Sequence, residues 1–294
     1  MSNYVTKIYT NIVSESIMIN TFKERLTKAS QINNSLLCIG LDPDPSLMPI
    51  KDVFNFNKAI IDATGDLVCA YKPNLAFYEA LGTHGIDILV KTVAYIHDNI
   101  PQILVLADAK RCDVDHTNVF YAKAIFDFMK FDGITVNPYL GRKSLEPFLS
   151  YGDKGVFVLC RTSNEGGDEF QNLCVKSGQL KLYQKIAKNT SLWNEKNNVA
   201  LVVGATCIEE LKSIRELCPD IPILIPGVGA QGGDLEMAVK FGVDIYGRNA
   251  LINSSRGIIY ASRDKSGFAQ SARQSALKLR DSINSILEDN GKAW

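Results

Sequence analysis

The chain has 294 residues, 46 % of them hydrophobic and 22 % charged, which is typical of a globular protein with a large buried core. Its 32 basic and 32 acidic residues cancel to zero net charge and form no long basic run, so a nucleic-acid-binding protein is not expected. No apolar stretch reaches the roughly 18 residues of a membrane span. Residues 1–20 also lack the continuous apolar segment of a signal peptide.

The cysteines indicate a reducing compartment. There are seven, an odd number, and none lies in a C-x-x-C motif: Cys38, Cys69, Cys112, Cys160, Cys174, Cys207 and Cys218. An odd number speaks against a disulfide framework, and the wide spacing without C-x-x-C speaks against a zinc site, so neither is expected. The prediction is a cytoplasmic protein without a metal site.

Eight short apolar runs recur along the chain, separated by longer amphipathic stretches. They are Leu36–Leu41, Val68–Tyr71, Ile103–Ala107, Gly133–Val136, Val156–Cys160, Leu201–Gly204, Ile221–Ile225 and Ala250–Ile252. Continuous apolar runs are typical of parallel strands buried on both faces. Helical spacing lies between them, for example over Asp87–His97 and Glu209–Leu217. We therefore expect an α/β fold, a (β/α)8 TIM barrel formed as a single domain over residues 1–294, with an open doubly wound sheet as the alternative.

Two segments do not fit the repeating strand–helix units. Residues 1–30 form an N-terminal extension, in which Ser16–Lys28 has the apolar spacing of an extra helix. Residues 164–198 form a polar insertion between the fifth and sixth strands, predicted to contain a loop and a helix around Leu180–Ala187. The insertion is interpreted either as a mobile lid or as a plain surface elaboration.

Charged and polar residues follow the first three predicted strands. The active sites of such barrels lie at the carboxyl ends of the strands, so these residues are candidates for a site. Asp108 and Lys110 are two positions apart and would point to the same side of an extended backbone. An ion-pair network that only closes the barrel is the alternative. The candidates are Asp42, Lys72, Asn74, Asp108, Lys110 and Asp113.

Later strands are followed by groups that could hold an anion. The seventh ends in Ile225–Asp234, whose glycines let backbone N–H groups approach a phosphate, and Asp234 could cap the next helix. Arg256 follows the eighth strand, where many barrels bind phosphate. Arg248 precedes that strand and should lie at the opposite end. A tight turn without a ligand is the alternative.

Cys160–Asn164 follows the fifth strand and contains two hydroxyl residues, Thr162 and Ser163. Their hydroxyl and backbone groups could bind the polar edge of a ring. Simple turn chemistry explains such a segment equally well.

These segments together resemble a known family. The matching stretches are Leu37–Asp44, Lys72–Asn74, Asp108–Asp113, Thr135–Gly141, Val158–Asn164, Val202–Thr206, Ile225–Asp234 and Asn253–Ile258. They are similar in order and composition to orotidine 5′-phosphate decarboxylases of the branch with the longer chain. The D-x-K-x-x-D motif alone is shared with related sugar-phosphate barrels, whereas its combination with the Gly/Gln loop and the late arginine is specific.

The resemblance implies a homodimeric barrel that converts orotidine 5′-monophosphate to UMP and CO2, the last step of pyrimidine synthesis, without a metal or cofactor. It implies that Lys72, Asp108, Lys110 and Asp113 form a catalytic array, with Lys110 protonating C6, and that Asp113 and Thr117 reach the neighbouring subunit's site. It further implies substrate contacts by Asp42 and Asn74 to the ribose, Thr162 and Ser163 to the pyrimidine, and Gly229, Gln231 and Arg256 to the phosphate.

Two other functions stay open at this point. A sugar-phosphate aldolase or epimerase of the same barrel group uses D-x-K-x-x-D with Mg²⁺. A catalytically silent nucleotide-binding protein is the other, although it would have no need to hold costly charges together.

The sequence also departs from the family pattern. Cys112 stands where a glycine is usual, which predicts an ordinary backbone there. Lys110 and Arg111 flank this cysteine and could lower its pKa, so a reactive thiol is one hypothesis and an inert small residue the other. Asp115 and His116 also depart from the pattern and lie close to Thr117, at the expected dimer contact.

Overall fold

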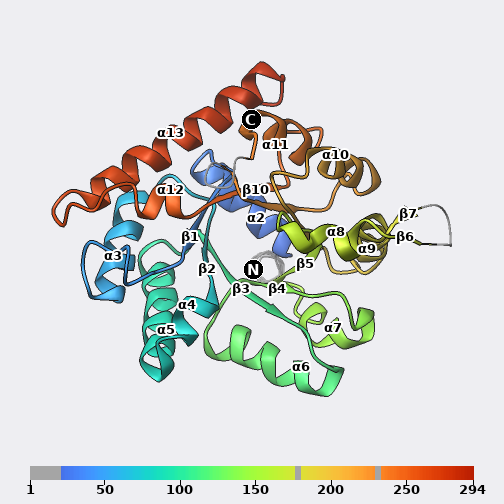
Figure 1. The fold of residues 1–294 in the computed structure, drawn as a ribbon, viewed down its shortest axis with the longest axis horizontal. Coiled ribbons are helices and arrows are strands. Elements are labelled where there is room, and N and C mark those ends of the chain that lie inside the picture. The colour runs from blue at the N-terminus through green and yellow to red at the C-terminus, as the bar shows by residue number, and fades with distance from the viewer. Residues whose placement is uncertain (1–20, 176–179, 229–232) are drawn as a thin grey trace, which may run out of the picture.

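The computed structural model describes residues 21–175, 180–228 and 233–294. Eight parallel strands close into a barrel in the order β1-β10-β9-β8-β5-β4-β3-β2, and helices surround it (Figure 1). The barrel strands are β1 (Leu37–Leu41), β2 (Ala70–Pro73), β3 (Leu104–Arg111), β4 (Gly133–Val136), β5 (Gly155–Arg161), β8 (Val199–Val203), β9 (Ile223–Pro226) and β10 (Ala250–Ser254). The predicted (β/α)8 fold is confirmed, and each of the eight apolar runs contributes one strand.

Helices follow the strands and cover the outside of the barrel. They are α3 (Val53–Thr64), α4 (Leu75–Glu79), α5 (Gly82–Asn99), α6 (Asp115–Ala122) with a π-helical continuation (Lys123–Phe128), α7 (Gly141–Leu149), α9 (Leu182–Leu192), α10 (Ile208–Leu217), α11 (Leu235–Gly242), α12 (Arg256–Ile259) and α13 (Phe268–Asp289). The Asp234 carboxylate accepts a hydrogen bond from Met237 N–H at 3.1 Å, so the predicted cap of α11 is confirmed. No helix within the described residues is long and apolar enough to cross a membrane.

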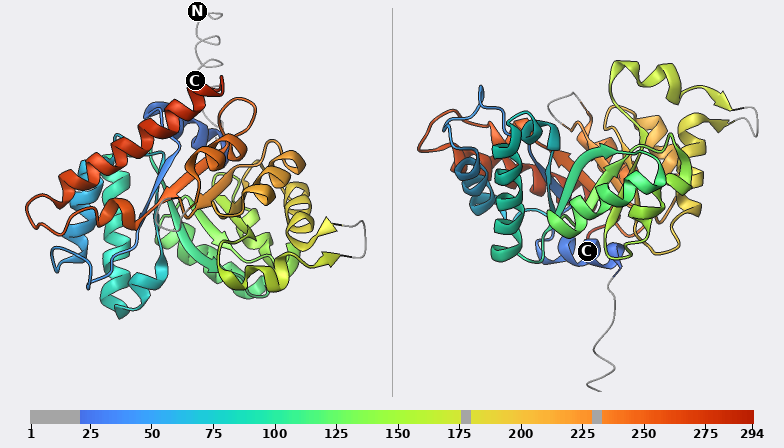
Figure 2. Two further views of the ribbon diagram at one scale, coloured as in Figure 1. Left: turned by 45° about the horizontal axis from the view of Figure 1, so that its top comes forward. Right: turned by 90° about the horizontal axis from the view of Figure 1, so that it is seen from below.

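Helix α2 (Phe22–Ile32) closes the amino end of the barrel (Figure 2). The sequence predicts this helix over Ser16–Lys28; it begins later and runs further, while residues 16–20 lie outside the described part. Phe22 is buried against Phe157 of β5, with ring centroids 5.5 Å apart. A Cβ on Gly155 would lie 2.5 Å from the Phe22 ring, so glycine is required for this close approach.

The insertion after β5 contains a 3₁₀ turn (Glu165–Gly167), α8 (Asp168–Gln171) and the antiparallel strands β6 (Cys174–Val175) and β7 (Leu180–Lys181) ahead of α9. The helix predicted around Leu180–Ala187 is thus present, shifted towards its C-terminus. In Figure 2, α8 and the β6–β7 pair lie at the end of the molecule opposite α2. The insertion therefore borders the face where the carboxyl ends of the strands meet.

Candidate active site

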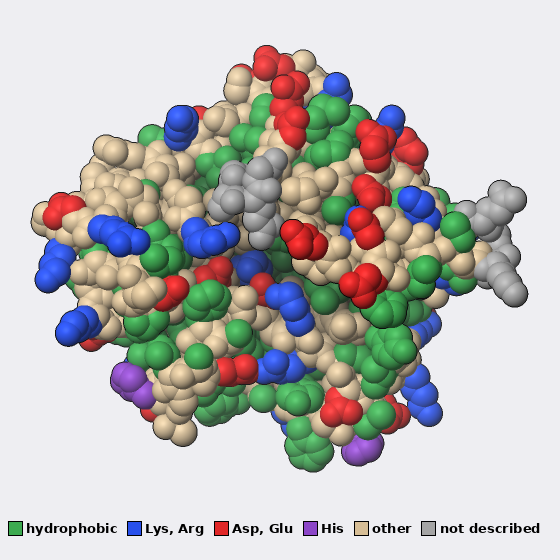
Figure 3. All heavy atoms as spheres, in the orientation of Figure 1, with side chains coloured by type: hydrophobic (Ala, Val, Ile, Leu, Met, Phe, Trp, Pro, Cys, Tyr) green, Lys and Arg blue, Asp and Glu red, His purple; other side chains and the backbone are tan. Residues whose placement is uncertain are grey.

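The carboxyl ends of the strands surround two adjoining cavities of about 360 and 270 Å³, which share Lys72 and Pro226 as lining residues. Figure 3 looks onto this face, where acidic and basic side chains surround a central hollow. The larger cavity reaches towards Arg256 and the smaller towards Lys110. One elongated ligand could occupy both.

Asp108 lies between two lysines where the cavities meet. Its Oδ2 accepts a hydrogen bond from Lys72 Nζ at 3.0 Å, and its Oδ1 accepts one from Lys110 Nζ at 2.6 Å. The Thr135 hydroxyl donates to the same Oδ1 at 2.9 Å. Lys72 is buried, whereas the Lys110 side chain is 51 % exposed. Lys110 is therefore the lysine that is more open to a ligand, although Lys72 also lines both cavities.

Electrostatic interactions keep both Asp108 and Lys72 charged. Burial alone raises the pKa of Asp108, but the ammonium groups of Lys72 and Lys110 outweigh burial, and the pKa of this carboxyl lies well below its ordinary value. Burial likewise lowers the pKa of Lys72, yet the carboxylates of Asp108 and Asp42 raise it above its ordinary value. Lys72 and Asp108 are thus ionised at neutral pH.

The backbone brings Lys110 to Asp108 in a way that simple strand alternation does not provide. Lys110 has φ = 46°, in the left-handed region, and the pairing of β3 with β4 shifts register between Ala107 and Arg111. Its N–H donates to the Thr135 hydroxyl at 2.9 Å. The expected proximity of the two side chains is observed, but the extended backbone assumed for it is wrong. A lysine in this conformation costs about 1–2 kcal/mol, a strain often found at functional sites.

Asp42 follows β1 and lines the larger cavity. Its Oδ1 accepts a hydrogen bond from Asn74 N–H at 3.3 Å. The Asn74 side chain caps α4, because its Oδ1 accepts from Ala76 N–H at 3.2 Å, and Asn74 is not among the residues that line either cavity. The structure therefore places Asp42 in contact with the ligand space and Asn74 beside it.

The far end of the larger cavity is lined by Gly227, Ser254, Ser255 and Arg256. Gly229 and Gln231, predicted from the sequence as phosphate ligands, lie outside the described residues. Arg248 lies at the other end of β10, with its guanidinium 5.6 Å from the centre of the Trp294 ring, as its place before the strand predicts.

Tyr260 was missed by the sequence reasoning. It lines the larger cavity, and its hydroxyl donates to the backbone carbonyl of Asp42 at 2.8 Å. Burial raises the pKa of this phenol to about 12. The available signal was its position four residues after Arg256, directly after the short helix that Arg256 begins.

Thr162 and Ser163 line the smaller cavity together with Lys72, Asp108 and Lys110. Its apolar wall comes from Leu159, Val202 and Leu224. Thr135, which contacts both Asp108 and Lys110, was also missed. A single polar residue inside the apolar run Gly133–Val136 was the signal that could have identified it.

Asp113 lies away from the lysines of its own chain. Its N–H donates to Asn118 Oδ1 at 3.0 Å, and its carboxylate accepts from Val114 N–H at 2.7 Å. Neither Asp113 nor Thr117 on α6 lines either cavity of this chain. Within one chain, three of the four predicted array residues are therefore brought together.

Cys112 is half-buried and does not have a positive φ, as its departure from glycine predicts. Burial raises the pKa of this thiol, and the Asp113 carboxylate adds to the effect. The suggestion that the flanking basic residues lower this pKa is therefore wrong, because burial dominates. Among the described residues, no group of three or more His, Cys, Asp or Glu side chains is arranged to hold a metal ion.

The chain is similar to known proteins in sequence and in fold. The model of the orotidine 5′-phosphate decarboxylase / HUMPS family matches residues 35–271. An orotidine 5′-phosphate decarboxylase of Dehalococcoides mccartyi (strain ATCC BAA-2100) is 51 % identical over 90 % of this chain and 97 % of its own length. One from Dechloromonas aromatica is 48 % identical over 90 % and 98 %.

The structure of Leishmania donovani OMP decarboxylase superimposes with a TM-score of 0.81 and 36 % identity, covering 90 % of this chain and 98 % of that one. Sequence and fold agree over most of both chains. The chain belongs to the orotidine 5′-phosphate decarboxylase / HUMPS family.

Proposed function

We propose that the two cavities bind orotidine 5′-monophosphate and that Lys110 and Asp108 carry out its decarboxylation to UMP and CO2. The observation that carries the assignment is the Asp108 carboxylate fixed between Lys72 and Lys110, beside an apolar wall and next to a cavity that ends at Arg256. A fixed charge pair suits the pyrimidine end of this nucleotide, and an arginine suits its phosphate.

The chemistry requires stabilisation of a carbanion. When the bond between C6 and the carboxylate breaks, CO2 leaves and the electron pair stays on C6, which has no good electron sink. The Lys110 ammonium would stabilise this charge electrostatically and then donate a proton to C6, giving UMP. Lys110 regains its proton from water. No electron acceptor is needed.

Asp108 would lie close to the departing carboxylate and disfavour the charged ground state more than the transition state. It also fixes the Lys110 ammonium at 2.6 Å. Lys72, buried on the other side of Asp108, keeps that carboxylate ionised and oriented. Each charge is thus held in place before the substrate arrives, which lowers the reorganisation that catalysis requires.

The phosphate would lie at the Arg256 end of the larger cavity, with Gln231 and the backbone near Gly229 as further donors. Asp42 would contact the ribose between the two ends, with Asn74 beside it. Binding energy from the distant phosphate can lower the barrier at C6 if it fixes the nucleotide in its reactive position.

We further infer that the active form is a homodimer in which Asp113 and Thr117 complete the neighbouring site. Both are half-buried and lie on or just before α6. Around them, large apolar side chains are exposed directly before α6, on α6 and in the loop after β4: Val114, Val119, Phe120, Tyr139 and Leu140. Figure 3 shows hydrophobic side chains gathered at the lower edge, over α6. Such a patch is typical of a subunit interface.

The test is the fall in ultraviolet absorbance when orotidine 5′-monophosphate is mixed with the purified protein and EDTA, with the product identified as UMP. Turnover in the presence of the chelator supports the metal-free decarboxylase. Nucleotide binding without turnover would instead indicate a silent binder. Sugar-phosphate chemistry restored by Mg²⁺, without loss of the nucleotide's absorbance, would indicate the aldolase or epimerase. Sedimentation velocity of the wild-type chain and of Phe120→Asp tests the dimer.

A further inference from the structure

The side chain of Gln171, at the end of α8 in the insertion, contacts both the backbone and the side chain of Thr162. Gln171 Oε1 accepts a hydrogen bond from Thr162 N–H at 2.8 Å, and its Nε2 donates to Thr162 Oγ1 at 2.8 Å. A backbone N–H can only donate, so the carboxamide orientation is fixed by this contact. A second donor, Arg161 Nη1, lies 3.2 Å from the same Oε1.

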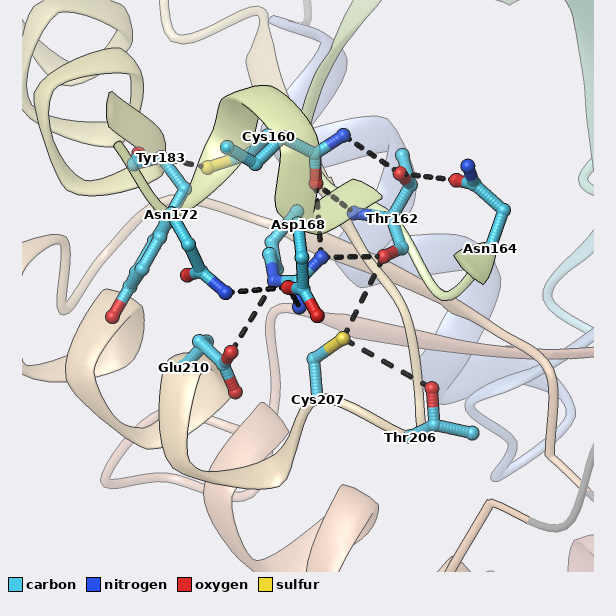
Figure 4. Close-up of polar contacts among 11 residues, drawn as sticks. Cys160, Thr162, Asn164, Asp168, Asn172, Tyr183, Thr206, Cys207 and Glu210 are labelled. Atoms are coloured by element: carbon cyan, nitrogen blue, oxygen red, sulfur yellow. Dashed lines mark hydrogen bonds and ion pairs between the residues drawn. The ribbon is translucent and has the colours of Figure 1, made fainter. Parts of the chain in front are cut away.

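The contacts of Thr162 within the protein occupy most of its hydrogen-bonding groups, so few of these groups remain for a ligand. Its hydroxyl accepts from Gln171 and therefore donates its single proton to Asn164 Oδ1 at 2.6 Å. Its carbonyl accepts from Arg161 Nη1 at 2.9 Å, and the Cys207 thiol lies 3.7 Å away (Figure 4). The N–H and the hydroxyl proton of Thr162 are thus both committed to other side chains of the loop.

Arg161 anchors this arrangement to the rest of the barrel. It is buried at the end of β5, with Nη2 2.6 Å from Asp168 of α8 and Nε 3.3 Å from Glu210 of α10. Figure 4 shows Asp168 and Glu210 approaching from these two elements. Because the ion pairs connect the insertion to a helix of the barrel, Gln171 is held at a fixed distance from the site.

The next residue, Ser163, is packed against Gly204, which directly follows β8. A Cβ on Gly204 would lie 2.7 Å from Ser163 Cβ and 2.9 Å from Ser163 N. Ser163 also lines the cavity that contains Asp108 and Lys110. Gln171, through Thr162, and Gly204, by direct contact, therefore define the position of Ser163 relative to Lys110.

We propose that Gln171 is a positioning residue for the pyrimidine. By hydrogen bonding both the N–H and the hydroxyl of Thr162, Gln171 fixes the position of the neighbouring Ser163, which contacts the polar edge of the ring. This inference rests on the proposed function, since it concerns the same nucleotide site. It gives the insertion a role in substrate recognition. It also gives Thr162, expected from the sequence to contact the pyrimidine, the role of a support.

The experiment compares Gln171→Leu with the wild-type chain by calorimetric titration with UMP and with ribose 5-phosphate. Ribose 5-phosphate lacks the pyrimidine and addresses only the larger cavity. We expect Gln171→Leu to weaken UMP about tenfold, the effect of roughly one or two lost hydrogen bonds. Its affinity for ribose 5-phosphate should stay within about twofold of wild type. In turnover, KM should rise more than kcat falls.

Gln171→Glu is the conservative variant. Its carboxylate can still accept from Thr162 N–H and from Arg161, so it should recover most of the UMP affinity. Gln184→Leu on α9 is the matched control, because Gln184 is also a half-buried glutamine, with its Nε2 donating to Ser213 at 2.9 Å, and it lines neither cavity. It should leave both affinities unchanged.

Equal weakening of UMP and ribose 5-phosphate by Gln171→Leu, or no change in either, would overturn the proposal. If Gln171→Leu fails to fold, Gln171→Ala takes its place: it must weaken UMP more than ribose 5-phosphate, and equal weakening of the two ligands would contradict the positioning role. A wild-type chain that neither binds UMP nor consumes orotidine 5′-monophosphate would instead contradict the proposed function itself.

Discussion

The two ends of the barrel each hold a buried carboxylate among cationic side chains. At the carboxyl end, Asp108 lies between Lys72 and Lys110. At the amino end, Asp132 just before β4 is 2 % exposed, with Arg25 Nη2 at 2.6 Å and Lys154 Nζ at 3.6 Å. Asp132 Oδ2 also accepts from Val105 N–H at 2.9 Å. By charge alone the two clusters look alike.

Their surroundings differ. Asp132 is covered by α2, whose Arg25 comes from the helix that closes the barrel. Asp108 opens onto a cavity through Lys110, and the Lys110 backbone is held in the left-handed region. An enclosed cluster can contribute only to stability, whereas an open and strained one keeps a charge available to a ligand. Burial and access, rather than charge, distinguish a structural cluster from a functional one.

Replacing Lys110 gives the largest expected effect. Lys110→Ala should lower kcat by at least about a thousandfold, since it removes the group that stabilises the transition-state charge. UMP binding should remain measurable, because the phosphate contacts are untouched. The ultraviolet assay and a UMP titration check this, with the exposed Lys188→Ala as the matched control. Near-normal turnover of Lys110→Ala would show that the open cluster is not catalytic.

Replacing Asp132 in the enclosed cluster should lower stability and leave turnover nearly unchanged, the reverse of what is expected for Lys110→Ala. Asp132→Asn leaves Arg25 and Lys154 without their buried partner and should lower the free energy of unfolding by about 3 kcal/mol. The kcat should stay within about twofold of wild type, since Asp132 lies at the other end of the barrel from the site. Urea unfolding measures the first quantity and the absorbance assay the second. Asp153→Asn, an exposed neighbour, should change stability by less than about 0.5 kcal/mol.

Arg256→Ala should act mainly on substrate binding. Loss of charge-assisted hydrogen bonds to the phosphate should raise KM by about ten- to hundredfold, with a smaller fall in kcat. Arg263→Ala, an exposed arginine seven residues later in the same region, is the control. If KM were unchanged in Arg256→Ala, the phosphate would have to bind elsewhere along the two cavities.

The eight strands could be predicted because parallel strands buried on both faces consist of continuous apolar runs, such as Val156–Cys160. The polar end of β3 could not be predicted this way, because Asp108–Arg111 lacks the apolar pattern and its bulge depends on pairing with β4. The position of Lys110 next to Asp108 was predicted, but its left-handed backbone was not.

The supports of the site were largely invisible in the sequence. Thr135 and Tyr260 each act through contacts with strands that are distant along the chain. Gln171 lies in a polar insertion whose sequence fits an ordinary surface loop. Likewise, nothing in the sequence near Asp132 distinguishes it from a surface aspartate before a strand, because its partner Arg25 is 107 positions away. Local patterns predict elements, whereas such contacts form only when the barrel closes.

The smallest expected effect concerns pH and the Lys72–Asp108 pair. The folded pKa of Asp108 is lowered, so its contribution to stability is full above its unfolded pKa of about 3.9 and is lost as the pH falls through the folded value. The folded pKa of Lys72 is raised, so its contribution is full below its unfolded pKa of about 10.4 and is lost only as the pH rises through the folded value. The pair therefore does not titrate between about pH 5 and 9.

The difference in unfolding free energy between wild type and Asp108→Asn should accordingly be constant between about pH 5 and 7, to within about 0.5 kcal/mol. It should begin to shrink only below about pH 4, where the unfolded carboxyl takes up its proton. Urea unfolding of both proteins at several pH values measures it. A difference that already shrinks between pH 7 and 5 would mean that the lysines do not outweigh the burial of Asp108, and that the open cluster is not held ionised before the substrate binds.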